Sequence, residues 1–389
     1  MQYNFDEVID RYGTSSVKYD LVEKVFGRND VTPMWVADMD FKAPQFILDA
    51  IKKRCEHPVL GYTFGSDNYF KVVIDWLKKH YDISAEKHEL HYVPGIVAGI
   101  SFCLQAFTEP GDKILVMNPV YPPFIKLPKN NGRNLLVNEL QLVDNQFVMD
   151  FEDFERKAKG CKMFILSNPH NPGGRVWSEE ELNRMADICY DNNVIVISDE
   201  IHADLTLHGF KHHSFASISQ KAKDISITFI APSKTFNIAG LATSIAYINN
   251  AELRNTLFSY LDNYEIANGN VFAYLGAEVA FCREGEIWLE QLKDYIAKNV
   301  TYVDEFFKKN LPLVKPILPQ ASFLVWLDFR GLNISHQQLV DRLINVAKVG
   351  LNNGLEFGDN YSCFMRMNIG CPTEKLVSAL DRIALSLNS

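Results

Sequence analysis

The 389-residue sequence predicts an α/β protein in which helices cover both faces of a sheet. Between residues 45 and 285, short apolar runs alternate with amphipathic stretches, among them the helical pattern 179–190. Most of the runs are continuously apolar, which is typical of strands that are buried on both faces. The predicted strands are His91–Val93, Lys113–Met117, Leu135–Leu140, Met163–Leu166, Val194–Ile197, Ile225–Ile230 and Ser244–Ile248.

The pattern of apolar residues changes after Gly285 and predicts a smaller α+β module. Its predicted elements are a helix at 288–309, a proline-rich break at 312–319, a strand at 322–327, a helix at 335–346, a strand at 363–369 and a helix at 373–387. We expect residues 46–285 to form a large domain and residues 286–389 a small one. Residues 1–45 are expected to join the small domain.

Composition excludes several classes of protein. The net charge is −9 and no run of Lys or Arg occurs, so nucleic acid is not an expected partner. No apolar run approaches the roughly 18 residues that span a bilayer, and the first residues do not resemble a signal peptide. The seven cysteines are scattered, odd in number and without a Cys-x-x-Cys pair. We therefore expect a cytoplasmic protein with reduced thiols and no membrane contact.

Two charged residues follow neighbouring predicted strands. Lys234 follows the strand 225–230, and Asp199 follows the strand before it. Lysine is usually solvated, but the small-residue stretch 238–241 favours burial here, and burial turns an amine into a usable nucleophile and base. A lysine for a Schiff base and a carboxylate that keeps a pyridine nitrogen protonated are the contacts pyridoxal 5′-phosphate (PLP) requires. Ser233 offers a hydroxyl to its phosphate.

Three further features fit the same cofactor. The motif 168–174, Asn-Pro-His-Asn-Pro-Gly-Gly, is a rigid turn after a strand, and Asn171 can donate to a ring oxygen there. The stretch 94–99 opens a helix with free N–H groups, which suits an anion. Tyr121 can stack on an aromatic ring. Each feature has a structural alternative: an ordinary turn, a helix start and a core aromatic residue.

Arginine and histidine residues raise two further questions. Arg366 lies among apolar residues of a predicted strand, so it needs a carboxylate partner, which is either a protein acid or a substrate. His202, His208, His212 and His213 cluster in the sequence but lack the carboxylate or cysteine company of a metal site. We expect no metal, and a solvated loop for the last three histidines.

This ordered set resembles the fold-type I PLP enzymes, the aspartate aminotransferase superfamily. More closely it is similar to the MalY/PatB-type cystathionine β-lyases and related carbon–sulfur lyases. The similar motifs cover nearly the whole chain and are 35–41 (WVADMDF), 61–63 (GYT), 198–202 (SDEIH), 231–241 (APSKTFNIAGL) and 321–328 (ASFLVWLD). The resemblance implies a three-layer fold with a mainly parallel seven-stranded sheet and a smaller α+β domain.

The resemblance also implies which residues bind PLP. They are Val97, Ala98, Tyr121, Asn171, Asp199, His202, Ser233 and Lys234. Lys234 attaches the cofactor and then moves the substrate Cα proton, and Asp199 pairs with the ring nitrogen. The amides of Val97 and Ala98 join Ser233 at the phosphate. His202 stands where many aminotransferases have a tyrosine, and Ala242 where many have an arginine, as is implied for the lyase branch.

Substrate and partner contacts are implied in the same way. Arg366 binds the α-carboxylate of a small amino-acid substrate, with Asn171 and the Ala37 backbone nearby. Tyr62 reaches the phosphate of a neighbouring subunit, so a homodimer with shared active sites is expected.

The activity implied is α,β-elimination of L-cystathionine or a related cysteine thioether to thiol, pyruvate and ammonia. An aminotransferase is the alternative, because it shares the steps up to removal of the Cα proton. A regulatory protein that keeps the PLP fold is a third hypothesis. No residue of the sequence decides between the two enzymes.

Overall fold

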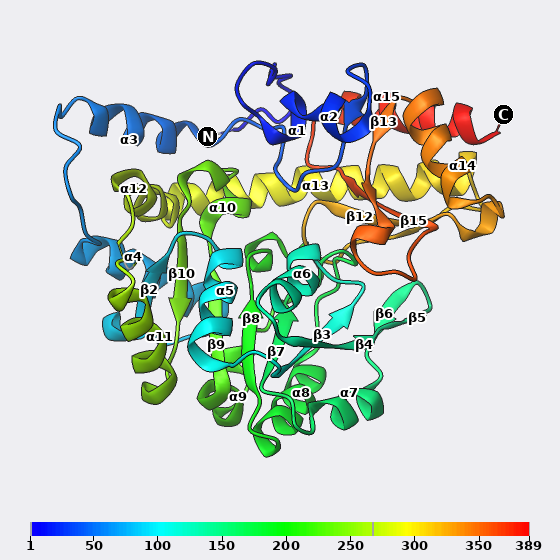
Figure 1. The fold of residues 1–389 in the computed structure, drawn as a ribbon. Helices are drawn as coiled ribbons and strands as arrows, with labels where there is room; N and C mark the ends of the chain where they lie inside the picture. Colours follow the sequence, from blue (N-terminus) through cyan, green and yellow to red (C-terminus); the bar gives the residue numbers. More distant parts are fainter. Residues whose placement is uncertain (1, 267, 389) are drawn as a thin grey trace.

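The computed structural model describes residues 2–266 and 268–388, and its centre is a seven-stranded sheet (Figure 1). The strand order is β2 (Leu90–Val93), β10 (Ser244–Tyr247), β9 (Ser226–Ile230), β8 (Ile195–Asp199), β7 (Met163–Ser167), β3 (Lys113–Asn118) and β4 (Asn134–Glu139). Strand β10 is antiparallel to both of its neighbours, and the remaining pairs are parallel. The prediction of a mainly parallel sheet of seven strands is therefore confirmed.

Burial on both faces explains why these segments are strands. All five residues of β7 and of β9 are buried, so the sheet needs a cover of helices on each side. Leu104 of one helix and Leu182 of another belong to the same apolar core as the strand residues. The helices are α1 (Val17–Asp20), α2 (Val22–Phe26), α3 (Gln45–Cys55), α4 (Asp67–Tyr81), α5 (Ile96–Phe107), α6 (Pro122–Asn130), α7 (Phe151–Ala158), α8 (Glu179–Asp191), α9 (Gln220–Ile225), α10 (Pro232–Thr235), α11 (Ala251–Asn263), α12 (Val271–Ala280), α13 (Arg283–Asn310), α14 (His336–Asp341) and α15 (Thr373–Asn388).

A second, antiparallel sheet forms the C-terminal part of the molecule. Its order is β11 (Lys315–Ile317), β12 (Leu324–Asp328), β15 (Phe364–Asn368) and β14 (Asn352–Asn353). Strand β11 lies inside the stretch predicted as a proline-rich break, and that expectation is wrong. Pro316 is tolerated because β11 is an edge strand, where a missing N–H leaves no ladder bond unmade.

Three other features depart from the predicted elements. The helix expected at 335–346 is α14 followed by a π-helical turn, Arg342–Val346. A hairpin of β5 (Gln141–Val143) and β6 (Gln146–Val148) was not predicted, although its Asp-Asn turn is typical of a two-residue hairpin. The domain limits at 45 and 285 stay predictions, and the second falls in the first turns of α13.

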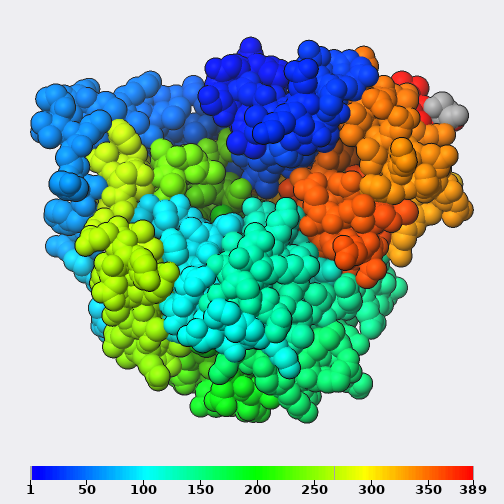
Figure 2. Space-filling model, in the orientation of Figure 1, coloured from blue at the N-terminus to red at the C-terminus, as the bar shows by residue number. Residues whose placement is uncertain are grey.

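The N-terminal segment lies against the C-terminal part (Figures 1 and 2). Strand β1 (Thr32–Pro33) pairs in parallel with β13 (Val349–Gly350). Asp40, which is 3% exposed, accepts charge-assisted bonds from Lys18 at 2.9 Å, Lys375 at 2.6 Å and Arg11 at 2.8 Å. A buried carboxylate with three cations fixes the segment that follows β1 against helix α15.

Within the described residues, we find no helix with the length and apolar character that a membrane span requires.

Candidate functional site

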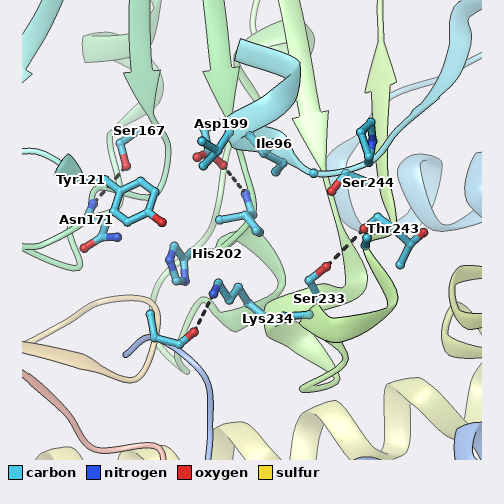
Figure 3. Close-up of a pocket in the computed structure, with 17 residues that line it drawn as sticks. Ile96, Tyr121, Ser167, Asn171, Asp199, His202, Ser233, Lys234, Thr243 and Ser244 are labelled. Carbon is cyan, nitrogen blue, oxygen red and sulfur yellow. Dashed lines mark hydrogen bonds between the residues drawn. The ribbon is translucent and has the colours of Figure 1, made fainter. Parts of the chain in front are cut away.

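A cavity of about 190 Å³ opens beside the carboxyl ends of β7, β8 and β9 (Figure 3). In open α/β sheets this edge is where ligands bind, because loops from several strands converge there. Its lining residues are Ala37, Pro94, Gly95, Ile96, Val97, Tyr121, Ser167, Asn171, Asp199, Ile201, His202, Ser233, Lys234, Ala239, Ala242, Thr243 and Ser244. Eight of the residues predicted to bind cofactor or substrate are in this set: Ala37, Val97, Tyr121, Asn171, Asp199, His202, Ser233 and Lys234.

Lys234 lies in the short helix α10, directly after the end of β9. Its Nζ points into the cavity and donates a hydrogen bond to the Ala37 carbonyl oxygen at 2.6 Å (Figure 3). Burial lowers the pKa of this amine to about 8, well below the ordinary value of a lysine. An amine that loses its proton so readily can act as a nucleophile and as a base near neutral pH.

Asp199 is the last residue of β8, and its side chain is buried. One carboxylate oxygen, Oδ1, accepts the Ile201 N–H at 3.0 Å, and no ion pair involves Asp199 within the described chain. Burial raises the pKa of this carboxyl to about 7. A protonated ring nitrogen placed opposite Asp199 would supply the positive charge that the protein does not.

The start of α5 and the residues around Ser233 form an anion site at the other end of the cavity. Gly95 caps α5 without a side chain, so its first N–H groups are available to a ligand. Ser233 lines the cavity, and the Thr243 hydroxyl is buried without a partner among the described residues. Ala98, expected here, is not among the lining residues, whereas Ile96 is.

Thr243 and Ser244 were missed by sequence reasoning. Because β10 is antiparallel, its amino end lies at the same edge of the sheet as the carboxyl ends of β8 and β9. The sequence gives no local sign of the direction of a strand. The run 242–244 therefore looked like an ordinary strand start.

Arg366 in β15 is a buried cation without a carboxylate partner within the described chain. Its guanidinium donates to Asn352 Oδ1 at 2.6 Å, to Asn171 Oδ1 at 3.1 Å and to the Trp35 carbonyl at 3.2 Å. Its Nε has no partner among the described residues, and burial lowers its pKa to about 10. Of the two partners left open by the sequence, a protein acid is not observed. A ligand carboxylate is the partner this charge lacks.

The structure places His202 where it was expected, but it does not place His212 on a solvated loop. His202 is buried in the cavity wall, and burial lowers the pKa of its imidazole to about 3, so the ring is neutral. His212 was expected on a solvated loop, but its side chain is only 5% exposed, and its Nε2 lies 3.0 Å from the Glu200 carboxylate. The expectation was wrong because a carboxylate 12 residues earlier folds back beneath this loop.

The segment 36–41, which we call the strap, closes the cavity on the side of Lys234. Asn237, three residues after that lysine, donates to the carbonyls of Met39 and Phe41 and accepts the Met39 N–H. Asn368, two residues after Arg366, donates to the carbonyls of Val36 and Asp38, both at 2.6 Å. The strap is thus held by the turn after α10, the helix that bears Lys234, and by the last residue of β15, the strand that bears Arg366.

Tyr62 lies outside the cavity of its own chain. Its side chain is fully exposed, in the extended segment between α3 and α4. A contact with the site of a second subunit is compatible with this place and stays a prediction.

Comparison with known proteins places this geometry in context. The family model for aminotransferases of class I and II matches residues 37–383. Cystathionine beta-lyase PatB from Bacillus subtilis is 42% identical over 387 residues, which is 99% of this chain and 100% of that protein. A PLP-bound putative aminotransferase from Clostridium difficile is 40% identical, with full coverage of both chains and a TM-score of 0.97. A PLP-bound C–S lyase from Staphylococcus hominis is 32% identical, with 100% and 99% coverage and a TM-score of 0.93.

The residues of the cavity fit PLP. Asp199 is a buried acceptor that would pair with a cationic ring nitrogen, the α5 start with Ser233 and Thr243 suits a phosphate, and Lys234 offers an amine whose pKa is lowered to about 8. The resemblance to fold-type I PLP enzymes is confirmed by the family match and by the PLP-bound structures with this fold.

The lowered pKa of Lys234 predicts how the attachment of PLP depends on pH. In cofactor-free protein, the rate should rise about tenfold per pH unit and level off above pH 8, because only the neutral amine attacks. With a lysine of ordinary pKa, the rate of attachment would keep rising up to pH 10. Stopped-flow absorbance measures the rate, with Lys234→Ala as the blank. A rate that still rises between pH 9 and 10 would contradict the prediction.

Proposed function

The chain belongs to the aminotransferase class I and II family, and we propose that it catalyses the α,β-elimination of cysteine thioethers. L-Cystathionine and related thioethers are the substrates, and the products are a thiol, pyruvate and ammonia. The enzyme depends on PLP. The PatB relative, named a cystathionine beta-lyase and similar over its whole length, supports this choice within the family.

One observation carries the substrate class. Arg366 is a buried cation with no carboxylate partner among the described residues, and its hydrogen-bond partner Asn171 lines the cavity that also holds the Lys234 amine. An α-carboxylate bound to the guanidinium would complete a charge pair that is now incomplete, and a pair of N–H donors would orient it. A small amino acid is therefore the ligand that the site lacks.

Bound PLP supplies an electrophilic aldehyde and a ring that accepts the electron pair of the substrate Cα–H bond. Lys234 Nζ accepts the Cα proton, which its low pKa permits near neutral pH. Asp199 holds the proton on the ring nitrogen, because a buried carboxylate favours a cationic partner. Arg366 and Asn171 keep the substrate carboxylate in place. The Cα electron pair would then form a Cα=Cβ double bond as the Cβ–S bond breaks and its electron pair leaves with sulfur. Lys234 can return its proton to that thiolate, and water hydrolyses the released enamine to pyruvate and ammonia.

Transamination is the second candidate. The 40% identical structure from Clostridium difficile is named a putative aminotransferase. The residues described above would serve either reaction, since both begin with removal of the Cα proton. The two differ in what they consume, because a transaminase needs a 2-oxo acid to complete its cycle and a lyase does not.

The lyase is tested by incubating PLP-loaded protein with L-cystathionine in the absence of any 2-oxo acid. We expect pyruvate and free thiol in equal amounts, measured by lactate dehydrogenase coupling and by a thiol reagent. Lys234→Ala removes the base and should abolish both products. A wild-type protein that releases no pyruvate, yet turns over once a 2-oxo acid is added, would make the enzyme an aminotransferase.

Arg366→Lys tests the carboxylate contact. Lysine keeps the charge but loses the planar fork, so kcat/KM for L-cystathionine should fall by about 100-fold. The matched control is a cysteamine thioether, which lacks the α-carboxylate. Its slow reaction should change by less than threefold or so, since it makes no bond to the guanidinium. Equal losses with both compounds would show that Arg366 supports the structure of the site and does not bind substrate.

We also propose that the enzyme is a homodimer with shared sites. The segment between α3 and α4 stands away from the body of the chain (Figure 1). It exposes four large apolar side chains, Val59, Leu60, Tyr62 and Phe64, by 60% to 111%. Such a run of exposed apolar residues is typical of a protein interface, and a second copy would bury it.

Mixed dimers test this assembly. Lys234→Ala and Tyr62→Ala are each expected to be inactive alone. In a shared-site dimer, one site of each hybrid carries both changes and the other carries neither, so random mixing should restore about a quarter of wild-type activity. Sedimentation measures the assembly, and Lys234→Ala mixed with itself is the control. A monomer, or a mixture without recovered activity, would contradict the shared site.

A further inference from the structure

Asp204 is a carboxylate at which three parts of the chain meet behind the cavity. It lies in the short 3-10 turn Ala203–Leu205, two residues after His202. Its Oδ1 accepts bonds from Trp76 Nε1 at 3.1 Å and from the Tyr81 hydroxyl at 3.0 Å, and its Oδ2 accepts one from the Thr235 hydroxyl at 2.8 Å. In the described part of the chain, Asp204 has no cationic partner. Neutral donors alone hold this carboxylate in place.

Thr235 is the residue that follows Lys234. It is fully buried and is the last residue of α10. A helix of four residues makes few backbone bonds of its own; the Phe236 N–H to Pro232 bond closes its one turn. The side-chain bond to Asp204 therefore contributes much of what fixes the direction of α10, and with it the starting point of the Lys234 side chain.

The other two donors are held rigidly. Trp76 stacks on Phe281 at 4.8 Å between ring centroids and on His80 at 4.1 Å. Tyr81 is buried, and burial holds the pKa of its phenol well above its usual range, so it remains a hydroxyl donor. Both residues lie in α4, which makes this helix the fixed reference for Asp204.

We propose that Asp204 is a positioning residue for the reaction: through Thr235 it holds Lys234 in register with the end of β8, which bears Asp199, and with the loop 200–206 after it (the β8 loop), which bears His202. The carboxylate belongs to the β8 loop, whereas the hydroxyl belongs to α10. Their bond sets the spacing between the group that binds the ring nitrogen and the amine that must reach the cofactor and the Cα proton. The inference rests on the proposed PLP chemistry of Lys234, but not on which reaction follows.

Thr235→Val tests the proposal, because valine removes the hydroxyl at nearly constant volume. Misplacing the amine should slow covalent attachment of PLP, trapped by borohydride reduction and located by peptide mass spectrometry, by about tenfold or more. In the loaded enzyme, kcat should fall by a similar factor while KM stays near the wild-type value, since the Arg366 contact is untouched. Thr235→Ser, which keeps the hydroxyl, should restore both rates.

The matched control is Thr108→Val at the far end of α5. The Thr108 hydroxyl is also buried and bonded, to the Leu104 carbonyl and to Arg133 Nε, but lies away from the cavity. The Thr108→Val substitution should lower the melting temperature without slowing the attachment of PLP to Lys234. If Thr235→Val lowers only the melting temperature, as Thr108→Val does, the positioning role is overturned. Should valine prevent folding, Thr235→Ala removes the same hydroxyl and must show the same slow attachment.

The rate at which PLP attaches to Lys234 tests this inference independently of the proposed function. A wild-type protein that binds PLP at Lys234 but transaminates would overturn the lyase and leave the Thr235 comparison valid. An attachment rate that is equal in Thr235→Val and in the wild type would overturn the positioning role, even if the lyase assay succeeds.

Discussion

Burial of charge without counter-charge is the constraint on which this structure depends. The pKa of Asp199 is raised, while those of Lys234, Arg366 and His202 are lowered, and burial is the first cause in each case. Each group is pushed towards its neutral form because burial outweighs the attraction of the charges around it, and none of the four forms an ion pair among the described residues. A ligand that brings a cationic ring nitrogen, an anionic phosphate and a carboxylate supplies what is missing. Binding of such a ligand would therefore stabilise the folded chain.

The two halves of the cavity are joined by the strap. Asn237 holds it from the turn that follows Lys234, and Asn368 from β15, the strand that bears Arg366. The three cations around Asp40 hold the end of the strap in turn. The Ala37 carbonyl reaches Lys234 only because backbone on both sides is fixed. Residues from distant parts of the sequence thus bind the same short segment. Hydrogen bonds, and not only apolar packing, fix its position.

Local patterns account for what could be predicted. Strands buried on both faces leave continuous apolar runs, so all seven strands of the large sheet were found, and Lys234 and Asp199 follow two of them. Contacts between distant residues leave no such pattern. Thr243 joins the anion site only because β10 runs antiparallel, and β11 tolerates its proline only as an edge strand. Trp76 and Asp204 are 128 residues apart, so nothing near Lys234 in the sequence indicates what holds it.

Arg366 and the Trp35 carbonyl that it contacts are 331 residues apart. During synthesis on a ribosome, the residues of the site therefore become available at very different times. Strand β8, which ends with Asp199, and strand β9, which leads to Lys234, emerge and can pair while β15 has not yet been synthesised. A nascent chain at that stage holds the amine but neither the guanidinium nor the second anchor of the strap. Loops that close over such separations form late and slowly. The proposed carboxylate-binding residue is thus synthesised last, after the strands that form the proposed cofactor site.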